Sequence, residues 1–320
     1  MTSVLVTGGA GYVGGVVVEH LKEAGERVVV LDSMERAPRA AIPDGVAFYE
    51  GPVGDGGLVA RIVADHDVDA CMHFAGLISV GESVREPQRY HQSNVAQTAT
   101  LLSTLVSEGV EIVVFSSSAA VYGDPLDVPI KEVHRHAPTS PYGWTKSAVE
   151  AMLSQLGTAG LLRSASLRYF NAAGAGSGRR EEHDPETHLI PLALDAASGA
   201  GPQLTVFGSD YDTPDGTAIR DYVHVDDLAT AHVLALGHLR SGAATTAFNL
   251  GNGAGYSVLD VIETVGAVTG QAVPHEMGPR RDGDPAVLVA SAELARTVLG
   301  WRPAHEALED IVASAQASRR

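Results

Sequence analysis

The segment Val4-Leu5-Val6-Thr7-Gly8-Gly9-Ala10-Gly11-Tyr12-Val13-Gly14 decides the fold of this chain, because an apolar strand runs directly into a glycine-rich turn. Glycines at positions 8, 11 and 14 permit a tight turn and let the backbone approach a pyrophosphate closely. The stretch 13–24 predicts a helix whose N-terminus offers unpaired N–H groups and the positive end of its dipole. The turn therefore indicates a dinucleotide site, although an ordinary strand–helix turn can have the same composition.

Apolar runs typical of buried parallel strands alternate with amphipathic stretches over the first 170 residues. The predicted strands cover 4–7, 27–31, 46–49, 70–74, 112–116 and 166–170, and the predicted helices cover 13–24, 57–65, 95–108 and 144–156. This alternation predicts an α/β fold built on a doubly wound parallel Rossmann sheet.

The pattern changes after residue 171. A loop is predicted over 172–184, a helix over 188–199, a strand over 204–207, a strand end and helix over 223–239, and a strand over 247–251. Ser257 and Ser291 are expected to cap helices over 258–268 and 292–299. We expect a Rossmann domain over 1–170, which 221–250 rejoin, and a smaller, discontinuous substrate lobe over 171–320.

Composition excludes several classes of protein. A formal net charge of −17 argues against nucleic-acid and anionic-membrane partners, which require a basic face. The single cysteine, Cys71, excludes an internal disulfide, and its predicted buried strand favours core packing over reactivity. Neither a signal peptide nor an apolar run of the ~18 residues that a membrane span needs is visible. We therefore expect a soluble, cytoplasmic protein with no bound metal.

Asp32 ends the second predicted strand, 18 residues after Gly14. A carboxylate at this place accepts hydrogen bonds from the adenosine ribose hydroxyls and repels a 2′-phosphate. The sequence therefore predicts NAD as the cofactor rather than NADP, and the alternative is an aspartate that only forms a turn.

A second group of motifs carries chemistry. Tyr142 and Lys146 are four residues apart at the start of a predicted helix, so they share one face. A nearby cation favours the phenolate of a tyrosine, whose free pKa of about 10 makes it a poor base. Ser118 follows the fifth predicted strand, at the sheet edge where ligands bind. Together with the glycine turn, these residues predict an enzyme that oxidises an alcohol with a nicotinamide.

Over nearly its whole length, the chain resembles the UDP-glucose 4-epimerases, which are extended short-chain dehydrogenases/reductases. The motifs that carry this resemblance are Val4–Gly14, His73-Phe74-Ala75-Gly76, Val80-Gly81-Glu82-Ser83, 116–123, 140–146, Arg168-Tyr169-Phe170-Asn171, Arg220-Asp221-Tyr222-Val223-His224-Val225 and Arg280-Arg281-Asp282-Gly283-Asp284. The resemblance implies an NAD-dependent isomerase of galactose metabolism that acts as a homodimer, with helices 95–108 and 144–156 at the subunit interface.

The resemblance also implies roles for individual residues. Tyr142 takes the proton of the sugar 4-hydroxyl, Ser118 hydrogen-bonds that oxygen, and Lys146 tunes the tyrosine. The implied cofactor contacts are Gly8, Gly11, Tyr12, Val13, Gly14, Asp32, Phe74, Ala75, Gly76, Asn94, Ser116, Tyr142, Lys146 and Tyr169. The implied substrate contacts are Ser118, Tyr142, Asn171, His188, Leu189, Phe207, Arg220, Arg281 and Asp284, with the two arginines on the diphosphate.

Three positions depart from the family pattern. Pro52 replaces an aspartate that contacts adenine, and Ile78 replaces a lysine near the cofactor phosphates. Losing one charged hydrogen bond costs roughly 1.5–3 kcal/mol, so we expect a weaker, exchangeable hold on NAD. Leu288 stands where a tyrosine would exclude an N-acetyl group, so UDP-N-acetylhexosamines are candidate substrates.

Other functions remain open at this point. A nucleotide-sugar 4,6-dehydratase needs an acidic pair after the serine, where this chain has Ala119 and Ala120. A UDP-glucuronate 4-epimerase is a closer alternative. A non-catalytic sensor of NAD or nucleotide sugars is the alternative from another class.

Overall fold

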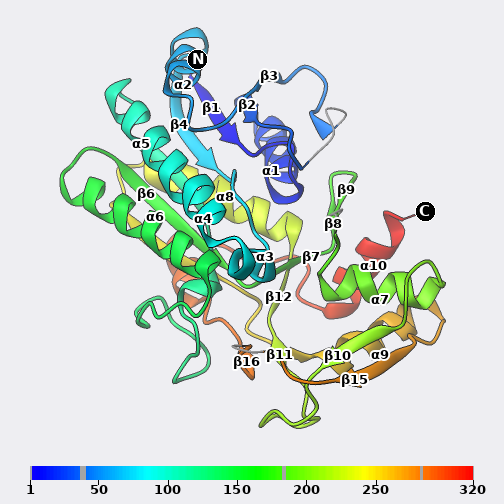
Figure 1. Cartoon of the computed structure of the whole chain (residues 1–320). Helices are drawn as coiled ribbons and strands as arrows, with labels where there is room; N and C mark the ends of the chain where they lie inside the picture. The colour runs from blue at the N-terminus through cyan, green and yellow to red at the C-terminus, as the bar shows by residue number, and fades with distance from the viewer. Residues whose placement is uncertain (1, 37–40, 182–184, 282–283, 320) are drawn as a thin grey trace.

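A seven-stranded parallel sheet forms the centre of the computed structural model, which describes residues 2–36, 41–181, 185–281 and 284–319 (Figure 1). Its strands are β1 (Ser3–Thr7), β2 (Arg27–Asp32), β3 (Ala47–Glu50), β4 (Val68–His73), β5 (Ile112–Ser118), β6 (Arg163–Tyr169) and β13 (Thr246–Leu250), in the order β13-β6-β5-β4-β1-β2-β3. The order reverses between β1 and β4, which confirms the doubly wound α/β fold. Ligands bind such sheets at this reversal, beyond the carboxyl ends of the strands.

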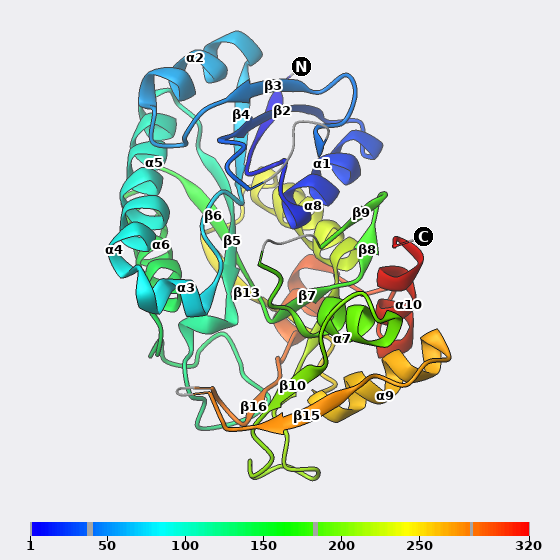
Figure 2. The same cartoon turned by 45° about the vertical axis from the view of Figure 1, so that its right-hand side comes forward.

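Helices cover both faces of the sheet (Figure 2). On one face α1 (Tyr12–Glu23) packs against α8 (Val225–Arg240), where apolar side chains of both helices share one core with β1, β4, β5 and β6. On the other face lie α2 (Gly56–His66), α5 (Gln97–Ser107) and α6 (Pro141–Thr158), which share a second core with the opposite side of the strands. Both faces are buried, which explains the nearly continuous apolar runs of these strands.

The helix predicted over 95–108 begins much earlier in the structure. After α3 (Val80–Arg85), α4 (Pro87–Tyr90) leads without interruption into a π-helical turn, His91–Ala96, and then into α5. Ser79 caps α3, and Pro87 stands at the start of α4, where its missing N–H is not needed. The polar residues of this stretch hid the helix from a search for apolar periodicity.

The rest of the chain forms a smaller assembly of short strands and helices below the sheet in Figure 1. Its elements are β7 (Asn171–Ala173), β8 (Ala175–Gly176), β9 (Arg179–Arg180), α7 (Leu189–Ser198), β10 (Leu204–Phe207), β11 (Ile219–Arg220), β12 (Tyr222–His224), β14 (Tyr256–Ser257), α9 (Val258–Thr269), β15 (His275–Gly278), β16 (Val287–Leu288), a π-helical turn (Ala295–Leu299) and α10 (Leu308–Ala317). Helices α7, α9 and α10 share a third apolar core.

Two predictions about this part need correction. The strand at Val223 does not rejoin the first sheet, because β12 pairs with β7, whereas β13 does pair with β6. The last predicted helix begins at Glu293, so Ala292 and not Ser291 precedes it. The cap predicted at Ser257 is confirmed, since Ser257 and Asp260 form a reciprocal capping box at the start of α9. No described helix is long and apolar enough to cross a membrane.

Candidate active site

The glycine turn lies at the reversal point of the sheet, between the ends of β1 and β4. Gly8 adopts a positive φ of 73°, and a Cβ on Gly14 would lie 2.3 Å from the carbonyl oxygen of Gly8. Helix α1 starts at Tyr12, with Gly11 as its N-cap, and its first turn has neither a side-chain cap nor an acidic residue. A helix start of this kind fits an anionic pyrophosphate, with Tyr12 and Val13 supplying the first helical N–H groups.

Asp32 is held directly against this turn. Its Oδ2 accepts a hydrogen bond from the N–H of Ala10 at 3.0 Å, and its Oδ1 accepts one from the N–H of Met34 at 2.9 Å. The backbone of Gly51 donates to the carbonyl oxygen of Asp32 at 2.9 Å, which brings Pro52 to the same edge. These bonds hold the carboxylate beside the glycine turn, at the position predicted to bind the adenosine ribose, and the residues fit NAD.

The turn after β4 closes the same site from its other side. The N–H groups of Phe74 and Ala75 both donate to the carbonyl oxygen of Thr7, at 2.9 and 3.1 Å, so this turn lies against the glycine turn. The amide of Asn94 bonds the N–H and the carbonyl oxygen of Leu77, both at 2.8 Å. Asn94 thus fixes the backbone just after Gly76, and its direct contact with a cofactor stays a prediction.

The side chain of Tyr12 ties the turn to the second part of the chain. Its hydroxyl donates to the carbonyl oxygen of Gly174 at 2.7 Å, between β7 and β8. Burial, with added repulsion from Glu181 and Asp226, raises the pKa of this phenol well above 10. Tyr12 therefore contributes a neutral structural bond, and its contact with the cofactor stays a prediction.

Ser118, Tyr142 and Lys146 come together where β5 ends and α6 begins. Ser140 caps α6, since its Oγ accepts the N–H of Gly143 at 3.2 Å, and this places Tyr142 and Lys146 on the first two turns. The Nζ of Lys146 donates to the carbonyl oxygen of Ser116 at 2.7 Å and lies 5.8 Å from the ring centre of Tyr142. The structure thus assembles the predicted catalytic group.

Two further residues predicted to contact the cofactor border this group. The hydroxyl of Tyr169, on β6, donates a hydrogen bond to the Oγ of Ser116 on the adjacent strand. The ring of Phe74 packs on the imidazole of His232, with the ring centres 4.7 Å apart. Both aromatic side chains therefore have partners inside the protein, and the imidazole of His232 contacts both of them.

The electrostatics of the group differ from the sequence prediction in one respect. Burial raises the pKa of Tyr142, and a hydrogen bond with Ser118 opposes this shift. Burial also lowers the pKa of Lys146 to about 8, although the charge of Glu150 acts in the opposite direction. The pKa of Tyr142 is therefore raised in the free protein and not lowered as the sequence predicted, because burial dominates and the spacing of two residues cannot reveal burial.

The predicted substrate residues gather below the sheet edge. The guanidinium of Arg220, on β11, forms an ion pair with the carboxylate of Asp284. The guanidinium of Arg281 stacks over the ring of Phe207, 4.0 Å from its centre. The backbone N–H of Asn171 donates to the carbonyl oxygen of Asp221, the residue after Arg220, at 3.0 Å. Asp282 and Gly283 of this motif lie outside the described residues.

His188 and Leu189 start α7 as N-cap and first helical residue. The Nδ1 of His188 lies 2.9 Å from a carboxylate oxygen of Glu181 and 2.7 Å from one of Glu186. Burial lowers the pKa of His188, but these carboxylates outweigh it and raise the pKa to about 10. His188 is thus a charged, doubly paired imidazolium, and its contact with a substrate stays a prediction.

Sequence reasoning missed several polar residues around the site. Tyr211, which follows β10, is buried near Arg220 and Asp284, and its hydroxyl has no hydrogen-bond partner among the described residues. A buried ion pair, Glu150 with Arg168, lies behind the catalytic group. Only the position of Glu150, four residues after Lys146, offered a signal for it.

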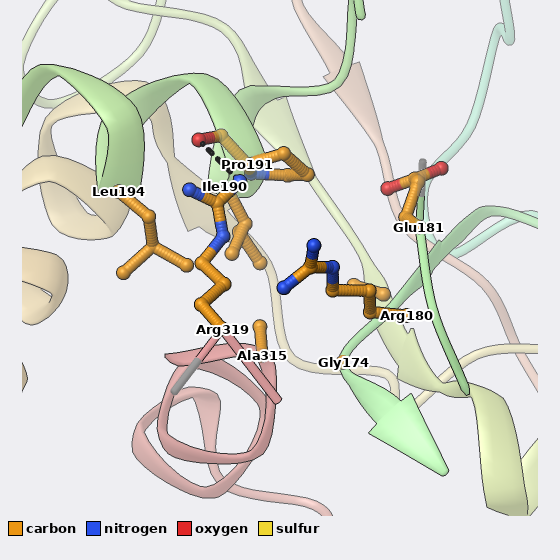
Figure 3. A pocket seen from close by; sticks show the side chains of 9 residues that line it. Gly174, Arg180, Glu181, Ile190, Pro191, Leu194, Ala315 and Arg319 are labelled. Atoms are coloured by element: carbon orange, nitrogen blue, oxygen red, sulfur yellow. Dashed lines mark hydrogen bonds between the residues drawn. The ribbon is translucent and has the colours of Figure 1, made fainter. Parts of the chain in front are cut away.

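A small pocket elsewhere is not part of this site. Figure 3 shows it between α7, α10 and the β8–β9 hairpin, where Arg180 and Arg319 face Ile190 and Leu194. Arg319 donates to the carbonyl oxygen of Pro191 at 3.2 Å. None of the predicted catalytic residues lines this pocket.

Comparison with known proteins supports the same chemistry. The UDP-glucose 4-epimerase of Halalkalibacterium halodurans is 48% identical over 312 residues, which cover 97% of this chain and 93% of that protein. The crystal structure of the Brucella ovis UDP-glucose 4-epimerase in complex with NAD matches with a TM-score of 0.96 and 42% identity, covering 99% of this chain and 98% of that one. The UDP-Glc/GlcNAc 4-epimerase of Campylobacter jejuni matches with a TM-score of 0.88 and 36% identity, covering 99% of both chains.

The sequence model of one protein family matches residues 4–251, which span the glycine turn, the catalytic group and all seven strands of the central sheet. The chain belongs to the NAD dependent epimerase/dehydratase family.

Proposed function

We propose that this protein is a UDP-glucose 4-epimerase that interconverts UDP-galactose and UDP-glucose with bound NAD. The observation that carries the proposal is the placement of Ser118, Tyr142 and Lys146 together at the carboxyl edge of the sheet, the same edge at which the glycine turn follows β1. Relatives that are UDP-glucose 4-epimerases, and an NAD complex of one of them, support it.

The proposed mechanism divides the work between the cofactor and the chain. When bound, NAD would supply a reversible hydride acceptor for sugar C4, so no redox equivalent would be consumed. Tyr142 takes the proton of the 4-hydroxyl and later gives it back, which balances each hydride transfer. Ser118 hydrogen-bonds the same oxygen, and the positive charge of Lys146 favours the phenolate form of Tyr142.

The substrate must be held by its UDP end, because the 4-keto sugar has to turn over between the two transfers. Arg220 and Arg281 are proposed to bind the diphosphate, and Asp284 the uridine ribose hydroxyls. Phe207 lies beside the proposed uracil position, and Asn171, His188 and Leu189 border the phosphates. In this arrangement Arg220 and Asp284, which pair with one another in the free protein, each exchange that partner for a part of the ligand.

A 4-epimerase of UDP-N-acetylglucosamine is the second candidate, and Leu288 favours it. Leu288 lies on β16 and packs against a cluster formed by Ala119, Val121, Tyr122 and Ile130, which follows the end of β5. A leucine leaves more room beside the sugar than a tyrosine would. UDP-glucuronate is a third candidate substrate, and a non-catalytic sensor is the remaining alternative.

We propose that this protein binds NAD with lower affinity than the family pattern implies. Pro52 provides no carboxylate at the edge beside Asp32, and the side chain of Ile78 is 42% exposed beyond the turn that follows β4. Neither residue supplies a charged hydrogen bond, so we expect NAD to exchange with solution.

We further propose that the protein is a cytoplasmic homodimer and that different parts of its chain bind NAD and the UDP-sugar. Helices α5 and α6 lie together on the outer side of the sheet, and Trp144 of α6 is 57% exposed there, which suits a helical interface between subunits (Figure 2). Residues 1–170, joined by α8 and β13 of the segment 221–250, are proposed to bind NAD, and residues 171–320 the UDP-sugar.

The experiment that tests the function follows UDP-glucose formation from UDP-galactose by NMR, with and without added NAD. Conversion that rises with added NAD supports both the epimerase function and the weakened affinity for NAD. Conversion that is independent of added NAD supports the function but contradicts the weakened affinity. UDP-N-acetylgalactosamine and UDP-glucuronate are run in parallel. Turnover of only one of these moves the assignment to that sugar, and no turnover of any of them with NAD present contradicts an epimerase.

A further inference from the structure

A buried ion pair lies directly behind the catalytic group. The side chains of Glu150, on α6, and Arg168, on β6, are each 7% exposed. The guanidinium holds both carboxylate oxygens, since its Nε lies 3.0 and 3.1 Å from them and its Nη2 lies 2.5 Å from Oε2. Both charges are therefore removed from water and fully paired.

This pair is connected to the catalytic group through β5 and α6. Tyr142, Lys146 and Glu150 follow one another at intervals of four residues on one face of α6. Each is bonded to one of three consecutive residues of β5, as Tyr142 bonds Ser118, Lys146 bonds the carbonyl of Ser116, and Glu150 accepts from the hydroxyl of Ser117.

The far side of the pair anchors the loop that follows Ser118. The Nη1 of Arg168 donates to the hydroxyl of Tyr122 at 2.7 Å and to the carbonyl oxygen of Glu132 at 3.1 Å. The hydroxyl of Tyr122 in turn donates to Oδ1 of Asn249 on β13 at 2.7 Å. Arg168 thus orients the carboxylate of Glu150 by bonds on both sides and fixes it in one place.

Stability alone does not explain this arrangement. A buried ion pair is no more stabilising than a well-packed apolar pair of the same volume. The position of the ion pair suggests a function, because the negative charge of Glu150 lies one helical turn after the buried Lys146. Burial lowers the pKa of Lys146 to about 8, and the charge of Glu150 acts against that shift.

We propose that Glu150, oriented by Arg168, is a positioning residue that keeps Lys146 positively charged and holds Ser118 against Tyr142. The proposal rests on the proposed epimerase function. Glu150 contacts neither the sugar nor the cofactor in this scheme and acts only through Lys146 and Ser117.

Other titratable groups face Lys146 and Glu150, and their charges influence the titration of Lys146. Tyr142 from α6 and His73 from β4 face Lys146, and Tyr169 from β6 faces Tyr142. The Nε2 of His136, in the loop before α6, lies 3.8 Å from Glu150. Burial, followed by the charge of Lys146, lowers the pKa of His73 to about 3, so this histidine stays neutral over the range to be titrated.

The experiment uses the fact that the chain has only three lysines, Lys22, Lys131 and Lys146. Lysine labelled with ¹³C at Cε gives three signals, of which only Lys146 comes from a buried side chain. Its titration is compared in the wild type, in Glu150→Gln and in Asp227→Asn, a control that removes another buried carboxylate bonded to the N–H groups of Ala304 and His305.

In Glu150→Gln we expect Lys146 to titrate about one pH unit lower, because a nearby opposite charge shifts a pKa by roughly that amount or more. The alkaline fall of kcat should move to lower pH by the same interval, and Asp227→Asn should move neither curve. Glu150→Asp, which keeps the charge, should restore most of the Lys146 titration.

Unchanged titration of Lys146 in Glu150→Gln, with only a lower melting temperature and a lower kcat at every pH, would overturn the proposal. Should Glu150→Gln not fold because Arg168 is left unpaired, the double variant Glu150→Gln with Arg168→Gln removes both charges and gives the same test. A wild type that titrates as expected but converts no UDP-sugar would instead remove the proposed function and leave the electrostatic coupling standing.

Discussion

The substitution Tyr142→Phe separates an enzyme from a sensor more sharply than any other change in this chain. Tyr142 is 9% exposed, and phenylalanine fills the same volume without its hydroxyl. The folded protein loses one hydrogen bond, with Ser118, so its free energy of unfolding should change by only about 0.5–1.5 kcal/mol. The loss of the proton acceptor should lower kcat by about 10²- to 10⁴-fold.

The assay measures UDP-galactose conversion at saturating NAD, together with UDP and NAD affinity by calorimetry. Ser154→Ala on the exposed side of α6 serves as a matched control that removes a hydroxyl from the same helix. Unchanged affinities with lost turnover fit the proposed role of Tyr142. If Tyr142→Phe kept more than about a tenth of the wild-type kcat, the assignment of Tyr142 as the acid–base residue would be refuted, because general acid–base catalysis contributes at least ~10²-fold.

Asp32→Asn should weaken NAD binding about tenfold to a hundredfold and reduce the preference for NAD over NADP, since it removes a charged acceptor at the glycine turn. Dissociation constants for NAD and NADP that stay unchanged in calorimetry would contradict this. Leu288→Tyr should raise the selectivity for UDP-galactose over UDP-N-acetylgalactosamine, and equal turnover of both by the variant would show that Leu288 does not border the 2-substituent. Burial lowers the pKa of His188, but Glu181 and Glu186 raise it from 6.5 to about 10. This ion pair should therefore stabilise the fold fully below pH 6.5 and lose that contribution as the pH rises through 10. An NMR titration of His188 with a midpoint near 6.5 would disprove the pairing.

The fold was largely predictable because both faces of its sheet are buried. Such strands read as continuous apolar runs, and all six strands predicted before residue 171 occur within a few residues of their expected bounds. The pairing of β12 with β7 was not predictable, since a three-residue strand carries no periodicity that identifies its neighbour. The early start of the α4–α5 helix was also hidden, because its first turns are polar.

The meeting of Ser118, Tyr142 and Lys146 was predictable, because a spacing of four residues puts the tyrosine and the lysine on one helix face and the serine ends a strand of the same sheet. The electrostatic environment of these residues was not, because burial depends on what the rest of the chain places around a residue. Arg168 lies next to the predicted Tyr169 in the sequence, yet only the register of β5 with β6 reveals that it faces Glu150. Likewise, the pairing of Arg220 with Asp284 joins residues that are 64 positions apart.

The return of the chain to its first sheet has a consequence for synthesis. Until β13 forms, β6 is an edge strand whose unpaired N–H and C=O groups invite another chain, and until α8 forms, the apolar side of α1 has no cover. The sheet cannot be completed before residue 250 has left the ribosome. A protein cut short near residue 170 would therefore be an aggregation-prone intermediate and not a small nucleotide-binding domain.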